Sequence, residues 1–368
     1  MRKLSIQDLR DTVVGATLLG SGGGGSPDNG MKLVDEIAKI TKEVNLVEPS
    51  EVPDTEYVAM VAGMGSPAAL KEKGFGPEAI YAFEGLQKIY RWIGVDFKLV
   101  MPCETGGFNT ITPIYVAAAK GLDVVDADGT GGRAVPELGT TLYFLYGIPT
   151  SPIVLADRNG NLVVGWTKDP MDAPLAEEIG RYVVTAFGML AGLGTWVATG
   201  NQVKSYLEPR VVWKSREVGR AVREAKVKGK DLVAEVVNVL KGYELIRGEI
   251  TKIETKTVAG FDFGKTTVQG IGAFKGKKLT VDFKNENMIA WKAENKPACM
   301  VPDLICLLGL DGKPLTNADT KKGMKIAVIG VPASDKWRKH PKGFEVWKHI
   351  LQKIGYKGGY KPVEKLLK

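Results

Sequence analysis

The acidic turn DADGTGGRAVPE, residues 126–137, holds the densest set of side chains that could do chemistry. Asp126 and Asp128 alternate by two, so an extended backbone puts both carboxylates on one side. Two close carboxylates raise one pKa and so provide an acid and a base from one residue type. They could also bind a divalent cation through oxygen. The turn therefore predicts catalytic carboxylates, with a purely structural Asp-Gly turn as the alternative.

Arg133 and Glu137 lie four residues apart in the same turn. If Arg133 opens a helix, the two side chains share a face. The guanidinium could then bind a substrate carboxylate through two parallel hydrogen bonds, and Glu137 could protonate a departing group. The alternative is an arginine–carboxylate pair that only stabilises the turn.

The loop PCETGGFN, residues 102–109, places Glu104 between an apolar strand pattern and a Gly-Gly turn. A carboxylate there could be a general base or could hold a ring N–H, and Asn109 could hold a ring amide. Helix capping is the alternative for both residues. Cys103 has no base beside it in the sequence, so we expect a buried, inert thiol.

Four consecutive glycines, Gly22, Gly23, Gly24 and Gly25, follow the first helical pattern. Glycine loses the most freedom on folding, so such a run needs a tight turn or a ligand to compensate. A helix precedes the run and no Gly-Lys-Ser/Thr follows it, which argues against Rossmann and P-loop nucleotide sites. We expect backbone N–H groups that bind an anion or a ring carbonyl, with a helix C-cap as the alternative.

Three polar residues of the second half are further candidates for substrate binding. Asn285 and Glu286 end an apolar strand pattern in FKNENMIA, and Asp303 lies among apolar residues in MVPDLICLL. They could face the first half across a cleft, where ligand sites tend to form. For Asp303 the alternative is an ordinary turn acid.

The apolar patterns of the sequence predict the helices and strands that position these loops. Helical patterns alternate with strand-sized apolar runs at 57–65, 97–102 and 122–129. This alternation predicts an α/β layered domain with a partly parallel sheet over residues 1–168. Ligands bind beyond the carboxyl ends of such strands, where the acidic turn and the PCETGGFN loop lie. Asn159-Gly160 predicts a hairpin between two apolar runs.

The pattern of apolar and polar residues changes in the second half of the chain. A helical pattern covers residues 171–194, a second one covers 215–229, and short alternating segments follow from about residue 248 onward. We therefore expect a helix-plus-β-rich C-terminal domain over residues 169–368. No low-complexity linker separates the two domains, so we expect them to contact each other.

Composition narrows the class of protein. The chain has 368 residues, three cysteines, two histidines and a formal charge of +8. So few histidines disfavour a histidine-rich metal site and a Ser-His-Asp triad. The lysine-rich segments have no nucleic-acid motif or interleaved aromatic residues, so we expect no nucleic-acid partner. No apolar run has the length of a membrane span, and the N-terminus lacks a signal-peptide core, so we expect a cytoplasmic protein.

Seven segments together resemble one family across nearly the whole chain. They are LGSGGGGSP, PCETGGFNTITP, GLDVVDADGTGGRAVPEL, LIRGEI, VDFKNENMIA, VPDLICLLGLDGKPL and VIGVPASDKWR with GYKPVE. In this order they are similar to the successive blocks of the family named for S-methyl thiohydantoin desulfurase, which is associated with the hydantoinase/oxoprolinase group.

The resemblance implies a two-domain cytoplasmic hydrolase. Its substrate would be a small five-membered cyclic imide-like ring bearing sulfur, and its products would be a hydantoin and a thiol. We expect a carboxylate-activated water, no obligatory cofactor and a homo-oligomer, with a divalent metal left open. A non-catalytic ligand-binding subunit serving a hydantoinase-like partner and a carboxylate–metal hydrolase remain as alternatives.

Overall fold

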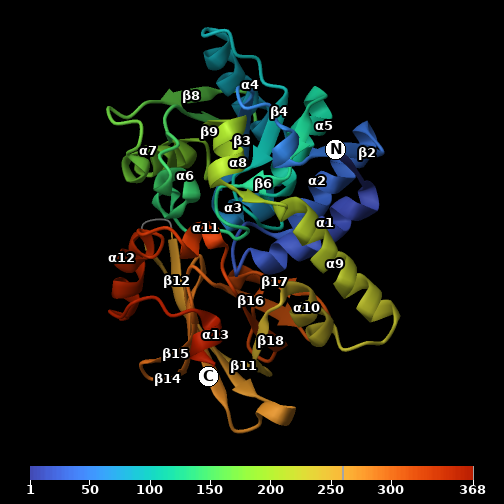
Figure 1. Cartoon of the computed structure of the whole chain (residues 1–368), viewed down its shortest axis with the longest axis vertical. Helices are drawn as coiled ribbons and strands as arrows, with labels where there is room; N and C mark the ends of the chain where they lie inside the picture. Colours follow the sequence, from blue (N-terminus) through green and yellow to red (C-terminus); the bar gives the residue numbers. More distant parts are fainter. Residues whose placement is uncertain (259–260, 368) are drawn as a thin grey trace.

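The computed structural model describes residues 1–258 and 261–367, with the side chains of residues 67, 68 and 71 left out. It has an α/β domain in the upper half of Figure 1 and a β-rich domain in the lower half. This arrangement confirms the predicted fold class. No helix in the described ranges is long and apolar enough to span a membrane.

The first domain is built on an eight-stranded sheet in the order β1-β2-β5-β4-β3-β9-β7-β8. Strands β2, β5, β4 and β3 are parallel to one another, and the remaining pairs are antiparallel. The strands are β1 (Arg2–Ser5), β2 (Glu43–Val47), β3 (Tyr57–Gly65), β4 (Leu99–Pro102), β5 (Asp123–Val125), β7 (Ile153–Ala156), β8 (Leu162–Gly165) and β9 (Leu190–Thr199). The expected Asn159-Gly160 hairpin joins β7 to β8.

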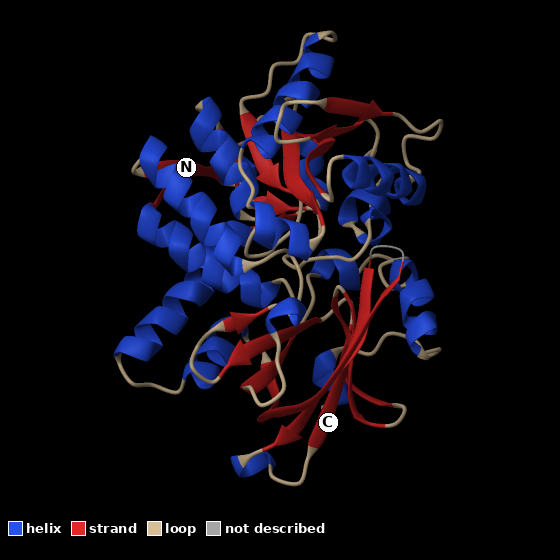
Figure 2. Ribbon diagram, turned by 180° about the vertical axis from the view of Figure 1, so that it is seen from behind, coloured by secondary structure: helices blue, strands red, loops and turns tan. Residues whose placement is uncertain are grey.

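The first two long helices of the first domain begin at serine residues that cap them. Ser5 caps the first helix in a reciprocal capping box with Asp8, and Ser26 caps the second at the end of the glycine run. The helices are α1 (Ile6–Leu19), α2 (Pro27–Ile40), α3 (Pro67–Lys73), α4 (Pro77–Arg91), α5 (Ile111–Lys120), α6 (Leu142–Leu145), α7 (Ala173–Ala186) and α8 (Gly200–Tyr206). Figure 2 shows helices on both sides of the first sheet.

The predicted helix over residues 171–194 is wrong in its second half. Helix α7 ends at Ala186, and Gly188 and Met189 then adopt positive φ angles of 75° and 72°. Strand β9 follows and lies between β3 and β7. Gly192 suits this central position because a Cβ there would lie 2.0 Å from the backbone oxygen of Glu78 on α4.

The second domain is built on an antiparallel eight-stranded sheet in the order β15-β14-β13-β12-β11-β18-β16-β17. Its strands are β11 (Tyr243–Val258), β12 (Phe261–Gly270), β13 (Lys278–Lys284), β14 (Glu286–Ala293), β15 (Lys296–Met300), β16 (Leu304–Gly309), β17 (Pro314–Leu315) and β18 (Lys325–Val331). Its helices are α9 (Val211–Val227), α10 (Leu232–Leu240), α11 (Asp335–Arg338), α12 (Glu345–Ile354) and α13 (Val363–Leu366).

The two domains are joined by shared packing rather than by a linker. Helix α1 crosses α9 so closely that a Cβ on Gly15 would lie 1.8 Å from the backbone oxygen of Ser215. One hydrophobic core runs from Met60 and Met101 of the first domain to Met288 and Trp347 of the second. A two-residue ladder also pairs β10 (Glu208–Pro209) with β6 (Ala127–Asp128). Loops at this junction are therefore held in place from both sides.

Candidate functional site

Three loops, two of which were predicted, lie at one edge of the first sheet. Strands β3, β4 and β5 run parallel, so their carboxyl ends point the same way. The loops that follow them begin after Gly65, Pro102 and Val125. The expected position of the PCETGGFN loop and the acidic turn beyond parallel strands agrees with this geometry.

The glycine run forms the turn between α1 and α2 and packs against the PCETGGFN loop. Gly22, Gly24 and Gly25 have φ angles of 93°, 74° and 82°, which glycine adopts at low cost. The carbonyl oxygen of Gly24 accepts hydrogen bonds from the amides of Phe108 and Asn109, each at 3.2 Å. A Cβ on Gly24 would lie 2.4 Å from Gly106 Cα, so the two backbones can approach only as glycines.

The second domain holds the other side of the same turn. The amide of Asn287 donates to the carbonyl oxygen of Ser21 at 2.7 Å, and the amide of Asn317 donates to that of Gly22 at 2.8 Å. A Cβ on Gly23 would lie 1.9 Å from Oε1 of Glu286. The glycine turn is therefore enclosed between the Glu104 loop and the Glu286 strand end.

Several backbone donors of this turn are unused. Within the described part of the chain, the amides of Gly22, Gly24 and Gly25 donate no hydrogen bond. Gly23 and Gly25 are partly exposed, as is Glu104. Gly22 and Gly24 are buried, so the unused amide of the partly exposed Gly25 is the one placed to receive an anionic or carbonyl oxygen.

Glu104 is held by a short polar chain. Its Oε1 accepts from Nδ2 of Asn109 at 2.7 Å, and its Oε2 accepts from the amide of Val135 at 3.1 Å. Oδ1 of Asn109 in turn accepts from the amide of Gly63 at 3.0 Å. Both ends of the Asn109 side chain are thus engaged, so this residue orients the Glu104 carboxylate.

Glu104 and Glu286 form a coupled pair of acids. Burial raises the pKa of Glu104, and the hydrogen bonds from Asn109 and Val135 offset this only in part. Burial also raises the pKa of Glu286, and the Glu104 carboxylate raises it further. Oε2 of Glu286 is buried and has no hydrogen-bond partner. The pair therefore keeps a proton at a pH where exposed glutamates have lost theirs.

Asp126 and Asp128 have separate sets of partners. Oδ1 of Asp126 accepts from the amides of Val212 and Trp213 at the start of α9. Burial raises the pKa of Asp126 to about 7 despite these bonds. Asp128 accepts from Thr105 Oγ1 at 2.7 Å and from the amides of Thr130, Gly131 and Gly132.

These hydrogen bonds support structural roles for Asp126 and Asp128. Asp128 closes its own Asp-Gly turn and fixes the residue that follows Glu104, while Asp126 holds the first turn of α9. The structural alternative therefore accounts for the contacts of both residues better than an acid–base pair does.

Glu137 does not share a helix face with Arg133, because residues 131–136 form no helix. Its carboxylate contacts Lys284 and accepts from His349 Nε2 at 2.6 Å. Burial raises the pKa of Glu137, but the bonds from His349 and Lys284 outweigh it and bring the value to about 2. A group with so low a pKa carries no proton near neutral pH and cannot serve there as an acid.

Arg133 links the domains. Its guanidinium is fully buried and donates to the backbone oxygens of Ala134, Pro302, Asp303 and Asn287, and it stacks over Trp347 at 4.9 Å. Burial lowers its pKa to about 10. The predicted role as a reader of a substrate carboxylate does not fit, because the group has no exposed surface.

Asn285 and Asp303 shape the second domain around the site. Asn285 has a positive φ of 54° and accepts from the amide of Asp262 through its side chain. Asp303 is fully buried and accepts from Arg338 and Tyr360, each at 2.7 Å. These contacts support structural roles for both residues.

Two residues that were not predicted complete the junction. Gly63 provides the amide that orients Asn109, and Asn317 donates from Nδ2 to the carbonyl oxygen of Asn285 at 2.7 Å. Gly63 lies near the carboxyl end of the apolar run at residues 57–65, and a position at the end of such a strand is a signal for a ligand site. Asn317 lies in a short turn that carries no such signal.

The described residues contain no group of three or more His, Cys, Asp or Glu side chains placed to hold a metal ion. All three cysteines are free and buried, as expected, and burial raises the pKa of Cys103 well above its ordinary value. Such a thiol is a poor nucleophile.

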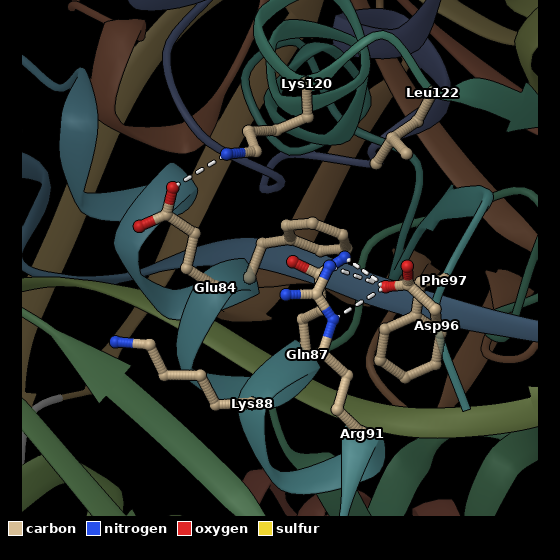
Figure 3. Close-up of a pocket in the computed structure, with 9 residues that line it drawn as sticks. Glu84, Gln87, Lys88, Arg91, Asp96, Phe97, Lys120 and Leu122 are labelled. Atoms are coloured by element: carbon tan, nitrogen blue, oxygen red, sulfur yellow. Dashed lines mark hydrogen bonds and ion pairs between the residues drawn. The ribbon is translucent and has the colours of Figure 1, made fainter. Parts of the chain in front are cut away.

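Two surface grooves lie apart from the junction. One, of about 390 Å³, is lined by side chains of α4, α5 and the loops beside them, and these include Glu84 paired with Lys120 and Arg91 paired with Asp96 (Figure 3). The other, of about 400 Å³, is lined by side chains around Trp291 in the second domain. Neither groove contains a predicted site residue.

Comparison with known proteins identifies the family to which the chain belongs. A crystal structure of a protein from Chromobacterium violaceum has a TM-score of 0.86 and 27% identity, over 99% of this chain and 100% of that one. No curated protein matches the chain. The model described as "S-Me-THD-like, N-terminal domain" matches residues 7–166, and "S-Me-THD-like, C-terminal domain" matches residues 171–363. The chain therefore belongs to the S-Me-THD-like family.

Proposed function

We propose that this protein hydrolyses a small cyclic amide or imide ring of the S-methyl thiohydantoin type and releases a thiol. Membership of the S-Me-THD-like family supports the substrate class. The observation that carries the proposal is the enclosure of one glycine turn, which has unused amides, by the partly exposed Glu104 and the buried Glu286.

Glu104 is the general base of this proposal. Burial raises its pKa toward the range in which a base works best near neutral pH, and Asn109 fixes the direction of its lone pairs. In its ionised form it takes a proton from water as the water oxygen bonds to the ring carbon that carries sulfur. The electrons of the ring C=N bond move to the nitrogen, which receives this proton from Glu104. The C–S bond then breaks, the attacking oxygen gives its remaining proton to the carboxylate that Glu286 has become by protonating the sulfur, and the carbon becomes the carbonyl carbon of the hydantoin product.

Glu286 is the acid. Its raised pKa lets it keep a proton that it gives to the departing thiolate, so the thiol leaves neutral. The free amide of the partly exposed Gly25 is the donor available for negative charge that develops on the ring during attack. This assigns to Glu286 the role that the sequence suggested for Glu137.

The test uses the full chain and an S-methyl thiohydantoin, with thiol release followed by a colorimetric thiol reagent. Glu104→Gln and Glu286→Gln should each lower kcat by about 10²–10⁴-fold. The matched control is Glu84→Gln in the groove of Figure 3, which should leave kcat unchanged. Unfolding midpoints measured in parallel show whether each variant is folded.

Two outcomes contradict the proposal. Full activity in a folded Glu104→Gln variant removes the base from the mechanism. Binding of the ring by the wild-type chain with no thiol release favours the non-catalytic subunit instead, and co-purification of a hydantoinase-like enzyme would strengthen that alternative.

A further inference from the structure

We infer that strand β8 is a dimer interface, through which two copies of this chain pair edge to edge and join their first sheets into one. The inference concerns assembly and does not rest on the proposed function. It would give the expected homo-oligomer a specific contact surface. It follows from the open edge of β8, from a comparison with the other sheet edges, and from the order of side chains along the strand.

The outer edge of β8 has backbone groups free for pairing. β8 is the last strand of the first sheet and pairs only with β7, and it lies at the outside of the upper domain (Figure 1). In the described part of the chain, no further backbone hydrogen bond involves residues 162–165. A row of unpaired N–H and C=O groups is a template for another strand. The occupant that fits this edge is therefore a β-strand.

The other three edges of the two eight-stranded sheets carry features that block such pairing. β1 has Arg2 and Lys3, β15 has Lys296 and Pro297, and β17 has only two residues, one of them Pro314. Charges, prolines and very short strands commonly protect sheet edges from association. β8 reads Leu-Val-Val-Gly, with no charge, no proline and no bulge in its pairing with β7. This contrast indicates that β8 is covered by a partner.

The side chains of β8 suit a second copy of the same strand. A twofold axis through Val164 and perpendicular to the sheet pairs the two strands antiparallel. It places Trp166, the residue after the strand, opposite the partner's Leu162, and Gly165 opposite the partner's Val163. An aromatic side chain then packs on an aliphatic one on one face, and on the other face glycine leaves room for valine. The contact is self-complementary, as an isologous dimer requires.

Apolar surface surrounds the open edge. Five large hydrophobic side chains of β8, the residue after it and α7 are exposed: Leu162, Val163, Trp166, Leu175 and Tyr182. The two on α7 lie one turn before and one turn after Ile179, which is close to Gly165 of β8. Together the five expose on the order of 500 Å², which is near the upper limit for a monomer and more than half of the roughly 800 Å² that each partner buries in a stable interface.

The first experiment measures the mass of the full chain by sedimentation velocity. The wild-type chain should be a dimer at micromolar concentration. Val163→Lys puts two like charges beside the twofold axis, so at the same concentration its mass should be half that of the wild-type assembly. The matched control is Val239→Lys on α10, where valine is exposed to 38%, against 37% for Val163, and it should remain a dimer. Unfolding midpoints show whether each variant is folded.

The second experiment, hydrogen exchange, tests for strand pairing itself. Amides of residues 162–166 should exchange more slowly in the wild-type chain than in Val163→Lys, while amides of β1 should exchange equally in both. A monomeric wild-type chain overturns the inference, as does an assembly whose mass Val163→Lys does not change. Loss of the dimer with equal exchange at residues 162–166 overturns the pairing of the two β8 strands.

Discussion

The carboxyl group of Glu286 lies directly against the α-carbon of Gly23, from the opposite domain. A Cβ at Gly23 would come within 1.9 Å of Oε1, closer than any side chain permits. Because Gly23, unlike Gly22, does not need a positive φ, alanine here would act through sterics alone. Gly23→Ala should displace the acid and lower kcat by about 10²-fold, the cost of a misplacement near 1 Å.

A matched glycine gives the control for this variant. Gly359→Ala adds a methyl group at a position where a Cβ would meet nothing within 4 Å. It should leave thiol release and the unfolding midpoint unchanged. Wild-type kcat in a folded Gly23→Ala variant would show that the position of Glu286 does not matter for turnover.

Asn109 should set the pH dependence of activity. Its hydrogen bond lowers the pKa of Glu104 against the effect of burial, so its removal leaves the pKa higher still. A base works when deprotonated, so activity rises with pH, and Asn109→Ala should move this rising limb of kcat/KM to higher pH. The control is Asn45→Ala, which removes a similar bond to Asp123, of 2.8 Å, on the first sheet. A shift in the control, or none in Asn109→Ala, would contradict this role.

Arg133 should matter for stability rather than for substrate choice. Arg133→Met leaves the backbone oxygens of Pro302, Asp303 and Asn287 without a donor, and the free energy of unfolding should fall by about 3–5 kcal/mol. Denaturant titration measures this loss. An undiminished free energy of unfolding, together with weaker binding of carboxylate-bearing rings, would restore its predicted role in substrate binding.

Glu137 should stabilise the fold in a pH-dependent way. Its pKa of about 2 lies below the ordinary value of about 4.3, so its contribution is complete above pH 5 and is lost as the pH falls toward 2. The shift alone corresponds to about 3 kcal/mol, but burial lowers the pKa of its partner Lys284, which shows that burying the ammonium offsets part of it.

The net loss in Glu137→Gln should therefore be about 2 kcal/mol at pH 7. Urea titrations of the variant and the wild-type chain should show this difference shrinking between pH 5 and pH 3. A difference that stays constant over that range would mean that the carboxylate charge is not its source.

Much of the fold could be predicted from the sequence because local sequence patterns agree with the tertiary packing. Ser5 begins the first helix, the glycine run ends it, and Asn159-Gly160 forms the expected hairpin. The pattern failed at residues 187–194, where FGMLAGLG is continuously apolar. Such a run does not distinguish a helix from a buried strand. This segment forms strand β9 because it pairs between β3 and β7, and both of these strands are far away in the sequence.

The site was predictable only in part, for a related reason. Position beyond parallel strands pointed to Glu104 and Asn109, and glycine content pointed to the turn at residues 22–25. For Arg133, the spacing within one loop led to a wrong prediction of its partner. Its guanidinium donates to the carbonyl oxygens of Pro302, Asp303 and Asn287, which are more than 150 residues away in the sequence. The short distance between Glu286 and Gly23 likewise exists only once the two domains meet.

Strand β9 has a consequence for how the chain can be divided. The family models separate at residues 166 and 171, yet β9, at residues 190–199, bridges β3 to β7 within the first sheet. A fragment ending between the two models would keep both halves of that sheet but lose the strand that unites them, leaving two open edges. Dissecting the protein therefore calls for a cut after Thr199, where the last contribution to the sheet is complete.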